Sequence, residues 1–307
     1  MSTPMVAMPS SRGEAFHSKN LGLSAQGWRA NLSIAWAVFI ARMRTIRRYK
    51  GFLIMEILLP TLFAALPILL GNAIAGSSKQ AAANFQDHTK TASYVAYMII
   101  GANVFMMVSG AMWNFGMWMR REQQTGTLES LLLSPASKAA ILSGTALYIS
   151  IRTSISFFIA FIFGCLAFGV PLEEIFAGNI LLALIFIYIG MIPVYGLSFL
   201  FGALIMEIKE ASSLVNLLQW VISLLMGIFF PITILPSWLQ FVAKIFPPSW
   251  MNNDVRSSLL DLSYFMGSWY LDLAVLFAFC LILPMVGLWI FSRAEKHVKR
   301  NQGLGQF

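Results

Sequence analysis

Long runs of apolar residues, separated by short polar segments, make up most of the chain. The runs lie at residues 52–74, 93–118, 142–168, 179–205, 212–231 and 269–292. A helix of about 20 apolar residues crosses the hydrocarbon core of a bilayer, and each run has roughly that length. The pattern therefore predicts an all-α polytopic membrane protein with six transmembrane helices.

Residues 231–268 interrupt this pattern. They are too apolar for a free loop, yet four prolines, Pro231, Pro236, Pro247 and Pro248, break any long helix. Non-helical backbone is tolerated at membrane depth only where protein or water covers it. We therefore expect short re-entrant helices that dip into the outer leaflet.

The N-terminal residues have a different character. Residues 1–27 are polar and rich in Ser, Gly and Met, so we expect a disordered cytoplasmic tail. Residues 28–50 carry Trp28, Leu32 and Trp36 at helical spacing and end in a cluster of Arg and Lys. This arrangement predicts a helix that lies in the membrane interface. The basic cluster either contacts anionic lipids or only fixes the topology.

The composition excludes a soluble protein. The chain is 58% hydrophobic and only 11% charged, whereas soluble domains carry about 25% charged residues. The net charge of +8 could indicate a nucleic-acid partner, but 16 of the 21 Lys and Arg residues fall in segments that six spans place on one side. By the positive-inside rule, we expect a multi-pass protein of the plasma or inner membrane with both termini cytoplasmic and no nucleic-acid partner.

The polar segment between the second and third runs has a pattern of its own. Residues 119–138 read MRREQQTGTLESLLLSPASK, in which a Thr precedes three Leu residues at positions i, i+3 and i+4. A Thr hydroxyl can cap the first turn of a helix, and these Leu side chains share one face. The segment predicts a short amphipathic helix at the cytoplasmic surface, although a solvated interfacial turn fits the spacing equally well.

The same loop resembles the cytoplasmic loop of type-2 ABC exporter permeases. Its pattern is E-x-x-x-G-T-L-E-x-L-L-x-x-P, and the matching residues are Glu122, Gly126, Thr127, Leu128, Glu129, Leu131, Leu132 and Pro135. In that family the loop is a coupling helix that docks into the nucleotide-binding subunit. The resemblance implies that these residues couple the chain to an ATPase.

A second stretch, residues 227–247, resembles the segment of this family that ends the fifth span and enters two re-entrant outer helices. The matching residues are Gly227, Phe230, Pro231, Leu235, Pro236, Trp238, Leu239 and Pro247. The resemblance covers about residues 28–300 and implies one six-span permease domain over that range.

The resemblance implies the permease half of an ATP-driven exporter of an amphiphilic, lipid-linked or glycan cargo. The sequence has no GxxxxGK[ST] phosphate loop, so ATP and magnesium are expected in a separate ATPase subunit, present in two copies. The chain is not expected to be an enzyme by itself. A second permease copy is expected, with a homodimer favoured over a heterodimer. The alternative is a non-transporting membrane scaffold or immunity protein with the same fold.

Three residues inside or beside the apolar runs are candidates for further roles. Arg152 is costly within a span, so it either faces a substrate path or a lipid head group, or snorkels to the inner interface. Glu56 is expected to pair with an Arg of the basic cluster. Met226 is a candidate for a soft, hydrophobic path, although ordinary helix packing is the simpler explanation.

The other polar residues give no catalytic pattern. Asp254, Asp261 and Asp272 are expected to be solvated groups at the outer surface. Cys165 and Cys280 lie in apolar runs without a metal-binding spacing. We therefore expect no catalytic site, no metal site and no cofactor bound by this chain.

Overall fold

The computed structural model describes residues 27–46, 48, 50–75, 85–87, 93–118, 137–171, 173, 176–206 and 211–302. These residues are almost entirely helical, and the prediction of an all-α polytopic membrane protein is confirmed. The predicted tail at residues 1–27 lies outside the described residues except for Gly27. The main helices are α1 (Trp28–Ile46), α2 (Lys50–Ala75), α4 (Tyr94–Ala111), α7 (Lys138–Ala167), α9 (Ile180–Met206), α10 (Ala211–Leu225), α11 (Ser237–Ile245), α12 (Pro247–Leu260) and α13 (Trp269–Gln302).

Five stretches in the described part of the chain are long and apolar enough to cross a membrane. They are Gly51–Ala73, Tyr94–Gly116, Ala139–Ala167, Ile180–Ile205 and Trp269–Ala294. Each of them coincides with one of the apolar runs predicted to span. The second stretch ends in a π-helical turn, η3 (Met112–Gly116).

The predicted fifth span differs from the other five. α10 has 15 residues and ends at Leu225, six residues before the predicted end of that span. A helix of this length is about 22 Å long, which is shorter than the hydrocarbon core of about 30 Å. Gly227 ends the helix in the left-handed region with a φ of 58°. Residues 207–210 lie outside the described part, so the count of six spans stays a prediction.

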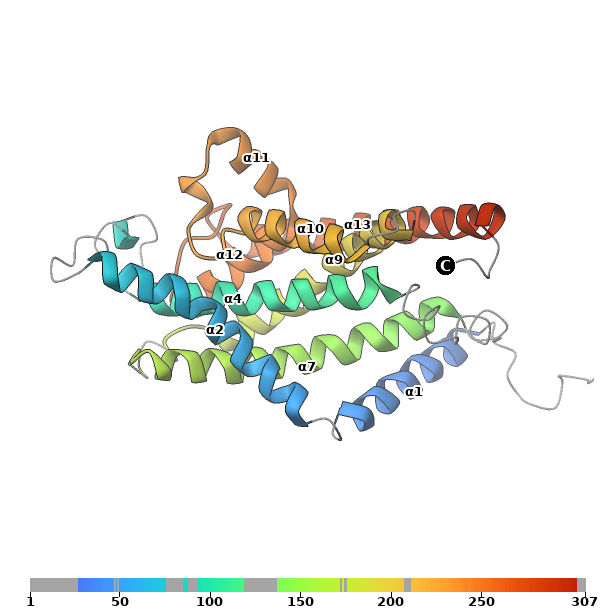
Figure 1. Cartoon of the computed structure of the whole chain (residues 1–307), viewed down its shortest axis with the longest axis horizontal. Coiled ribbons are helices and arrows are strands. Elements are labelled where there is room, and N and C mark those ends of the chain that lie inside the picture. Colours follow the sequence, from blue (N-terminus) through green and yellow to red (C-terminus); the bar gives the residue numbers. More distant parts are fainter. Residues whose placement is uncertain are drawn as a thin grey trace, which may run out of the picture.

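α4 occupies the centre of the helix bundle. Figure 1 shows it between α9 and α13 on one side and α7 on the other, and it contacts α2, α7, α9 and α12. Protein buries 83% of its apolar stretch, against 22% for α2 and 11% for α13. Lipid tails are as apolar as Leu, so the outer helices can turn large side chains away from the protein without loss.

Glycine contacts bring α9 and α13 close together. A Cβ atom at Gly287 of α13 would lie 2.2 Å from the carbonyl oxygen of Gly196 in α9. Similarly, α1 approaches α7 at Gly144, where a Cβ would lie 2.2 Å from the carbonyl oxygen of Ala35. Small residues at such crossings let helix backbones approach closely in the absence of a hydrophobic driving force.

α1 lies on the outside of the bundle with no buried residue. Trp28, Leu32 and Trp36 are 69%, 60% and 55% exposed. An exposed helix with large apolar side chains agrees with the predicted interfacial helix, although its end at Ile46 comes before the basic residues Arg48 and Lys50.

The bundle has two distinct ends. At one end, α10 finishes, α13 begins, and α12 packs on the first turns of α4 and α9. At the other end, Ile205 of α9 and Val215 of α10 form a small cluster with Trp113 and Met117. The chain leaves the described part at Trp118 and returns at Ser137 near this second end (Figure 1).

The contact between α9 and α13 predicts that Gly287→Ala destabilises the fold. The added methyl group meets a backbone oxygen that cannot move aside, and overpacking of this kind costs about 1–3 kcal/mol. The midpoint of thermal unfolding in detergent should fall. Gly71→Ala is the matched control, because Gly71 also lies in a helix but has no atom within 4 Å of its built Cβ. Equal midpoints for the two variants would contradict this packing.

Candidate functional site

The short helices predicted for residues 231–268 are present at the end of the bundle where α10 finishes. Pro231 precedes the 3₁₀ turn η4 (Ile232–Ile234), Pro236 precedes α11, and Pro247 opens α12. Proline favours these positions because it lacks an N–H and has a fixed φ. Gly227 is required before them, because its positive φ and a built Cβ 2.6 Å from the Phe230 carbonyl oxygen exclude other residues.

The two helices of this hairpin, α11 and α12, have opposite surroundings. On α11, Trp238, Phe241 and Ile245 are 67%, 67% and 56% exposed. On α12, Trp250, Met251 and Val255 are buried. α11 therefore presents an apolar face outward, while α12 belongs to the core. Whether α11 and α12 are re-entrant in a bilayer stays a prediction.

Polar side chains of α12 hold the end of α10. The Asn252 amide donates to the Met226 carbonyl at 2.7 Å, and the Ser249 hydroxyl donates to that of Leu225 at 3.0 Å. Arg256 donates to the carbonyls of Tyr97 and Gly227 at 3.1 and 2.9 Å, and also to that of Ile228. The last carbonyls of a helix have no partner within it, and α12 supplies partners here. Sequence reasoning missed this role, because no local pattern indicates which carbonyl groups Arg256 reaches.

Two of the three aspartates expected at the outer surface are buried instead. Asp254 and Asp272 are both 0% exposed, whereas Asp261 is exposed at the end of α12. The carboxylate of Asp272 accepts the backbone N–H groups of Phe265 and Met266 at 2.7 and 2.8 Å. The expectation fails for these two because the turn before α13 folds over them and shields them from solvent.

Asp254 and Asp272 are neighbours in this buried region. Burial, together with the nearby carboxyl group of Asp272, raises the pKa of Asp254 well above its usual value. Two ionised carboxylates repel each other, so one of the pair must keep a proton. The raised pKa of Asp254 favours its protonated form.

Inside the bundle, Arg152 of α7 forms an ion pair with Glu56 of α2 at 3.1 Å. Arg152 and Glu56 have side chains 11% and 18% exposed. This gives Glu56 a partner outside the basic cluster with which it was expected to pair. The Arg152 guanidinium also lies over the rings of Phe52 and Tyr148, at 4.9 and 5.5 Å. Charge pairing and aromatic contacts reduce the cost of holding both groups within the spans.

A small cavity of about 30 Å³, with both polar and apolar walls, adjoins Glu56. Glu56, Asn103, Thr153 and Ser156 contribute to its walls. One oxygen of Glu56 has no hydrogen-bond partner in the described structure. A polar cavity of this size can hold a water molecule. The ion pair and the cavity beside it form a polar island within apolar helices. A role of Arg152 in a substrate path stays a prediction.

The other predicted residues are placed as follows. Met226 is 1% exposed and lines a second cavity beside α12, described below. The coupling residues Glu122, Gly126, Thr127, Leu128, Glu129, Leu132 and Pro135 lie outside the described residues. In the described part of the chain, no group of three or more His, Cys, Asp or Glu could hold a metal ion.

The ion pair predicts strong coupling between Glu56 and Arg152 in a double-mutant cycle. Glu56→Gln or Arg152→Met alone leaves one buried charge without its partner and should cost about 3 kcal/mol. The double variant removes both charges and should recover most of the loss in thermal stability. Additive effects would show that the pair is not coupled.

The buried carboxyl pair predicts a stability that depends on pH. Because the folded pKa of Asp254 is raised, the folded chain binds more protons than the unfolded chain above about pH 4. Stability should fall as pH rises through this window and level off above the folded pKa. Asp254→Asn should flatten that slope, measured as the unfolding midpoint between about pH 5 and 9. Asp261→Asn, at an exposed position, is the control and should leave the slope unchanged.

Comparison with known proteins agrees with this architecture. Residues 71–292 match the family model described as ABC-2 family transporter protein. The protein named "Putative transport permease ycf38" of Cyanophora paradoxa is 23% identical over 303 residues, which cover 92% of this chain and 99% of that protein. "Putative transport permease YvfS" of Bacillus subtilis (strain 168) is 22% identical over 211 residues, which cover 68% of this chain and 78% of that protein. The family match extends over most of the chain, over three of the five candidate spans in full and over nearly all of a fourth. This protein therefore belongs to the ABC-2 transporter family as a membrane-spanning permease subunit.

Proposed function

We propose that the chain is the permease subunit of an ATP-driven exporter. The observation that carries the proposal is the family match over residues 71–292. The arrangement of the bundle supports it. The segment that resembles a coupling loop is attached, at Trp118 and Ser137, to the end of the bundle opposite the α11–α12 hairpin. Export requires an ATPase-docking segment on one side of the membrane and a release site for the cargo on the other.

ATP hydrolysis belongs to a partner in this proposal. Nucleotide binding needs a loop of backbone N–H groups, a Lys and a magnesium ligand brought together, and the sequence has no such loop. Two copies of an ATPase subunit dock on the loops at residues 119–138. Glu122 and Glu129 lie on the polar side of the expected helix and are the residues best suited to contact an ATPase.

A second copy of the permease completes the assembly. The exposed face of α10 carries Leu217, Trp220 and Val221, and also the exposed side chain of Asn216. An amide turned toward lipid tails would lose its hydrogen bonds with water. A face of this kind is better suited to a neighbouring copy, or to a path between two copies, than to lipid. A homodimer is the simplest such assembly.

In this proposal the protein lies in the plasma or inner membrane. Both of its termini face the cytoplasm. This orientation rests on the excess of Lys and Arg in the segments attached to one side of the spans. The cargo is an amphiphilic, lipid-linked or glycan molecule. The competing function is a scaffold or immunity protein that keeps the fold without transport.

Charge reversal in the loop tests the coupling. Glu129→Lys should abolish most transport and weaken binding of the ATPase subunit, because it reverses a charge at the docking surface, while membrane insertion stays normal. Asp87→Lys is the matched control, since Asp87 is an exposed acid beyond the opposite end of α4. Transport of candidate lipids, glycans and amphiphiles into vesicles gives the readout.

Full transport by Glu129→Lys would falsify the coupling assignment. A purified complex that lacks any ATPase yet moves cargo would exclude the exporter, and a mass that fits one permease copy would exclude the dimer. If the complex with its ATPase transports none of these cargoes, the scaffold function is favoured.

A further inference from the structure

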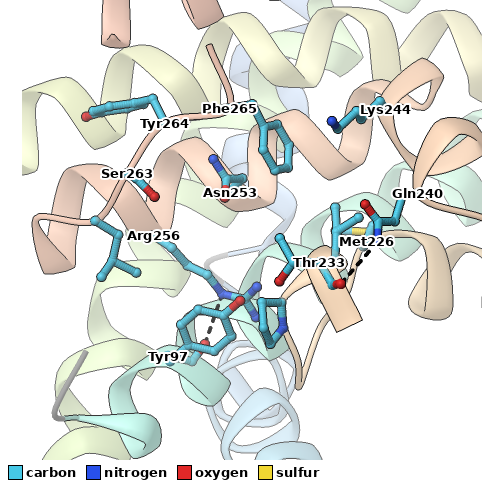
Figure 2. Close-up of a pocket in the computed structure, with 13 residues that line it drawn as sticks. Tyr97, Met226, Thr233, Gln240, Lys244, Asn253, Arg256, Ser263, Tyr264 and Phe265 are labelled. Carbon is cyan, nitrogen blue, oxygen red and sulfur yellow. Dashed lines mark hydrogen bonds between the residues drawn. The ribbon is translucent and has the colours of Figure 1, made fainter. Parts of the chain in front are cut away.

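A cavity of about 280 Å³ lies beside α12, at the end of the bundle that carries the hairpin. Its walls come from the first turn of α4, from η4, α11 and α12, and from residues 262–265 before α13. Figure 2 shows Arg256 reaching from α12 to the ring of Tyr97, with Lys244 of α11 across the cavity. Segments distant in the sequence thus converge on one site.

The cavity is positively charged. Lys244 and Arg256 both line it, and its lining residues include no carboxylate. Arg256 is 3% exposed, and the described residues provide it with no ion pair. A buried guanidinium without a counter-charge is costly, so the site favours the arrival of an anion.

Arg256 also has hydrogen-bond donors to spare. A guanidinium has five N–H groups, and three of them bond to the carbonyls of Tyr97, Gly227 and Ile228. The ring of Tyr97 covers one face of the guanidinium, with its central carbon 3.7 Å from the ring centroid. These contacts fix the orientation of the side chain, and two of its N–H groups donate to none of these carbonyls. Planar Arg donors suit the oxygens of a phosphate.

The surroundings favour an amphiphile as the source of that phosphate. α11 turns Lys244 and Gln240 toward the cavity, and it presents Trp238 and Phe241 outward with 67% exposure each. One short helix therefore borders both the polar cavity and an apolar surface of the kind that contacts lipid. The volume is close to the lower limit of about 300 Å³ for ligand pockets, which suits a head group without its chains.

We propose that this cavity is a binding site for a phosphate group, with Arg256 as its buried anchor and Lys244 as the cation at its rim. The phosphate belongs either to a lipid head group or to a free phosphate-bearing solute. The site is distinct from the polar island at Glu56 and Arg152. The inference goes beyond the transport function proposed above and does not depend on it.

The test uses the purified full-length chain in detergent. Native mass spectrometry compares retention of phosphatidylglycerol with that of phosphatidylcholine. In phosphatidylcholine, the quaternary ammonium of the choline group balances the negative charge of the phosphate. Calorimetry measures inorganic phosphate directly, and competition between phosphate and phosphatidylglycerol identifies a shared site. The wild-type chain should retain phosphatidylglycerol in preference to phosphatidylcholine.

Variants at the rim of the cavity distinguish a loss of ligand binding from a loss of folding. Lys244→Met keeps the aliphatic stem and should weaken binding about tenfold, the loss expected for one charge-assisted hydrogen bond. Lys244→Arg should restore it. Asn253→Asp places a carboxylate in the lining and should weaken binding further. Arg44→Met removes an exposed cation of α1, far from the lining residues, and should leave binding unchanged.

The outcomes are separable. Binding of phosphatidylglycerol that free phosphate displaces supports the phosphate site, and binding without displacement supports the lipid as its source. Binding of inorganic phosphate alone supports a soluble ligand. Equal retention of the two lipids by the wild type, with no phosphate binding, overturns the proposal. So does equal binding by wild type, Lys244→Met and Asn253→Asp when all three share one unfolding midpoint. None of these results depends on an ATPase or on transport.

Discussion

The structure depends on how the backbone is satisfied where α10 stops. The last carbonyl groups of a helix have no partner within it, and each one left unpaired in a buried position costs about 1–3 kcal/mol. Here three side chains of the neighbouring helix α12 donate hydrogen bonds to these carbonyl groups. They are Ser249, Asn252 and Arg256. Because Arg256 also bonds to Tyr97, the same contacts join α10, α12 and α4.

Three ionisable side chains that the described part of the chain withdraws from solvent are stabilised in three different ways. Arg152 has an opposite charge in Glu56. Asp272 accepts two backbone N–H groups, and burial raises the pKa of its neighbour Asp254. Arg256 has only neutral carbonyls and an aromatic ring. Of these three side chains, only Arg256 lines a cavity large enough for a ligand. Its charge therefore stabilises the fold and also lies beside a cavity that an anion can enter.

Burial is distributed unevenly among the helices of this chain. α4 is buried within one chain, while α2 and α13 leave most of their surface outside it. Lipid can cover such faces at no cost, and so can a second copy with small or polar residues at the contact. The exposed amide of Asn216 on α10 marks the face where protein or water is more favourable than lipid.

The sequence by itself determined the helical membrane class, five of the spans and the break around Pro231 and Pro236. These features follow from apolar run length and from proline chemistry, which are local properties. The coupling role of the loop at residues 119–138 also rests on a pattern of neighbouring residues, and it stays a prediction.

Only the tertiary structure decided the partners of the polar residues. Glu56 and Arg152 are about a hundred positions apart, and no local pattern indicates that α2 and α7 place them together. Asp254 was expected at the surface because α12 is polar in sequence, yet the helix is buried between α4, α9 and the turn before α13. Pairing across the bundle is set by which helices pack, and that depends on contacts such as Gly196 with Gly287 that a single sequence does not specify.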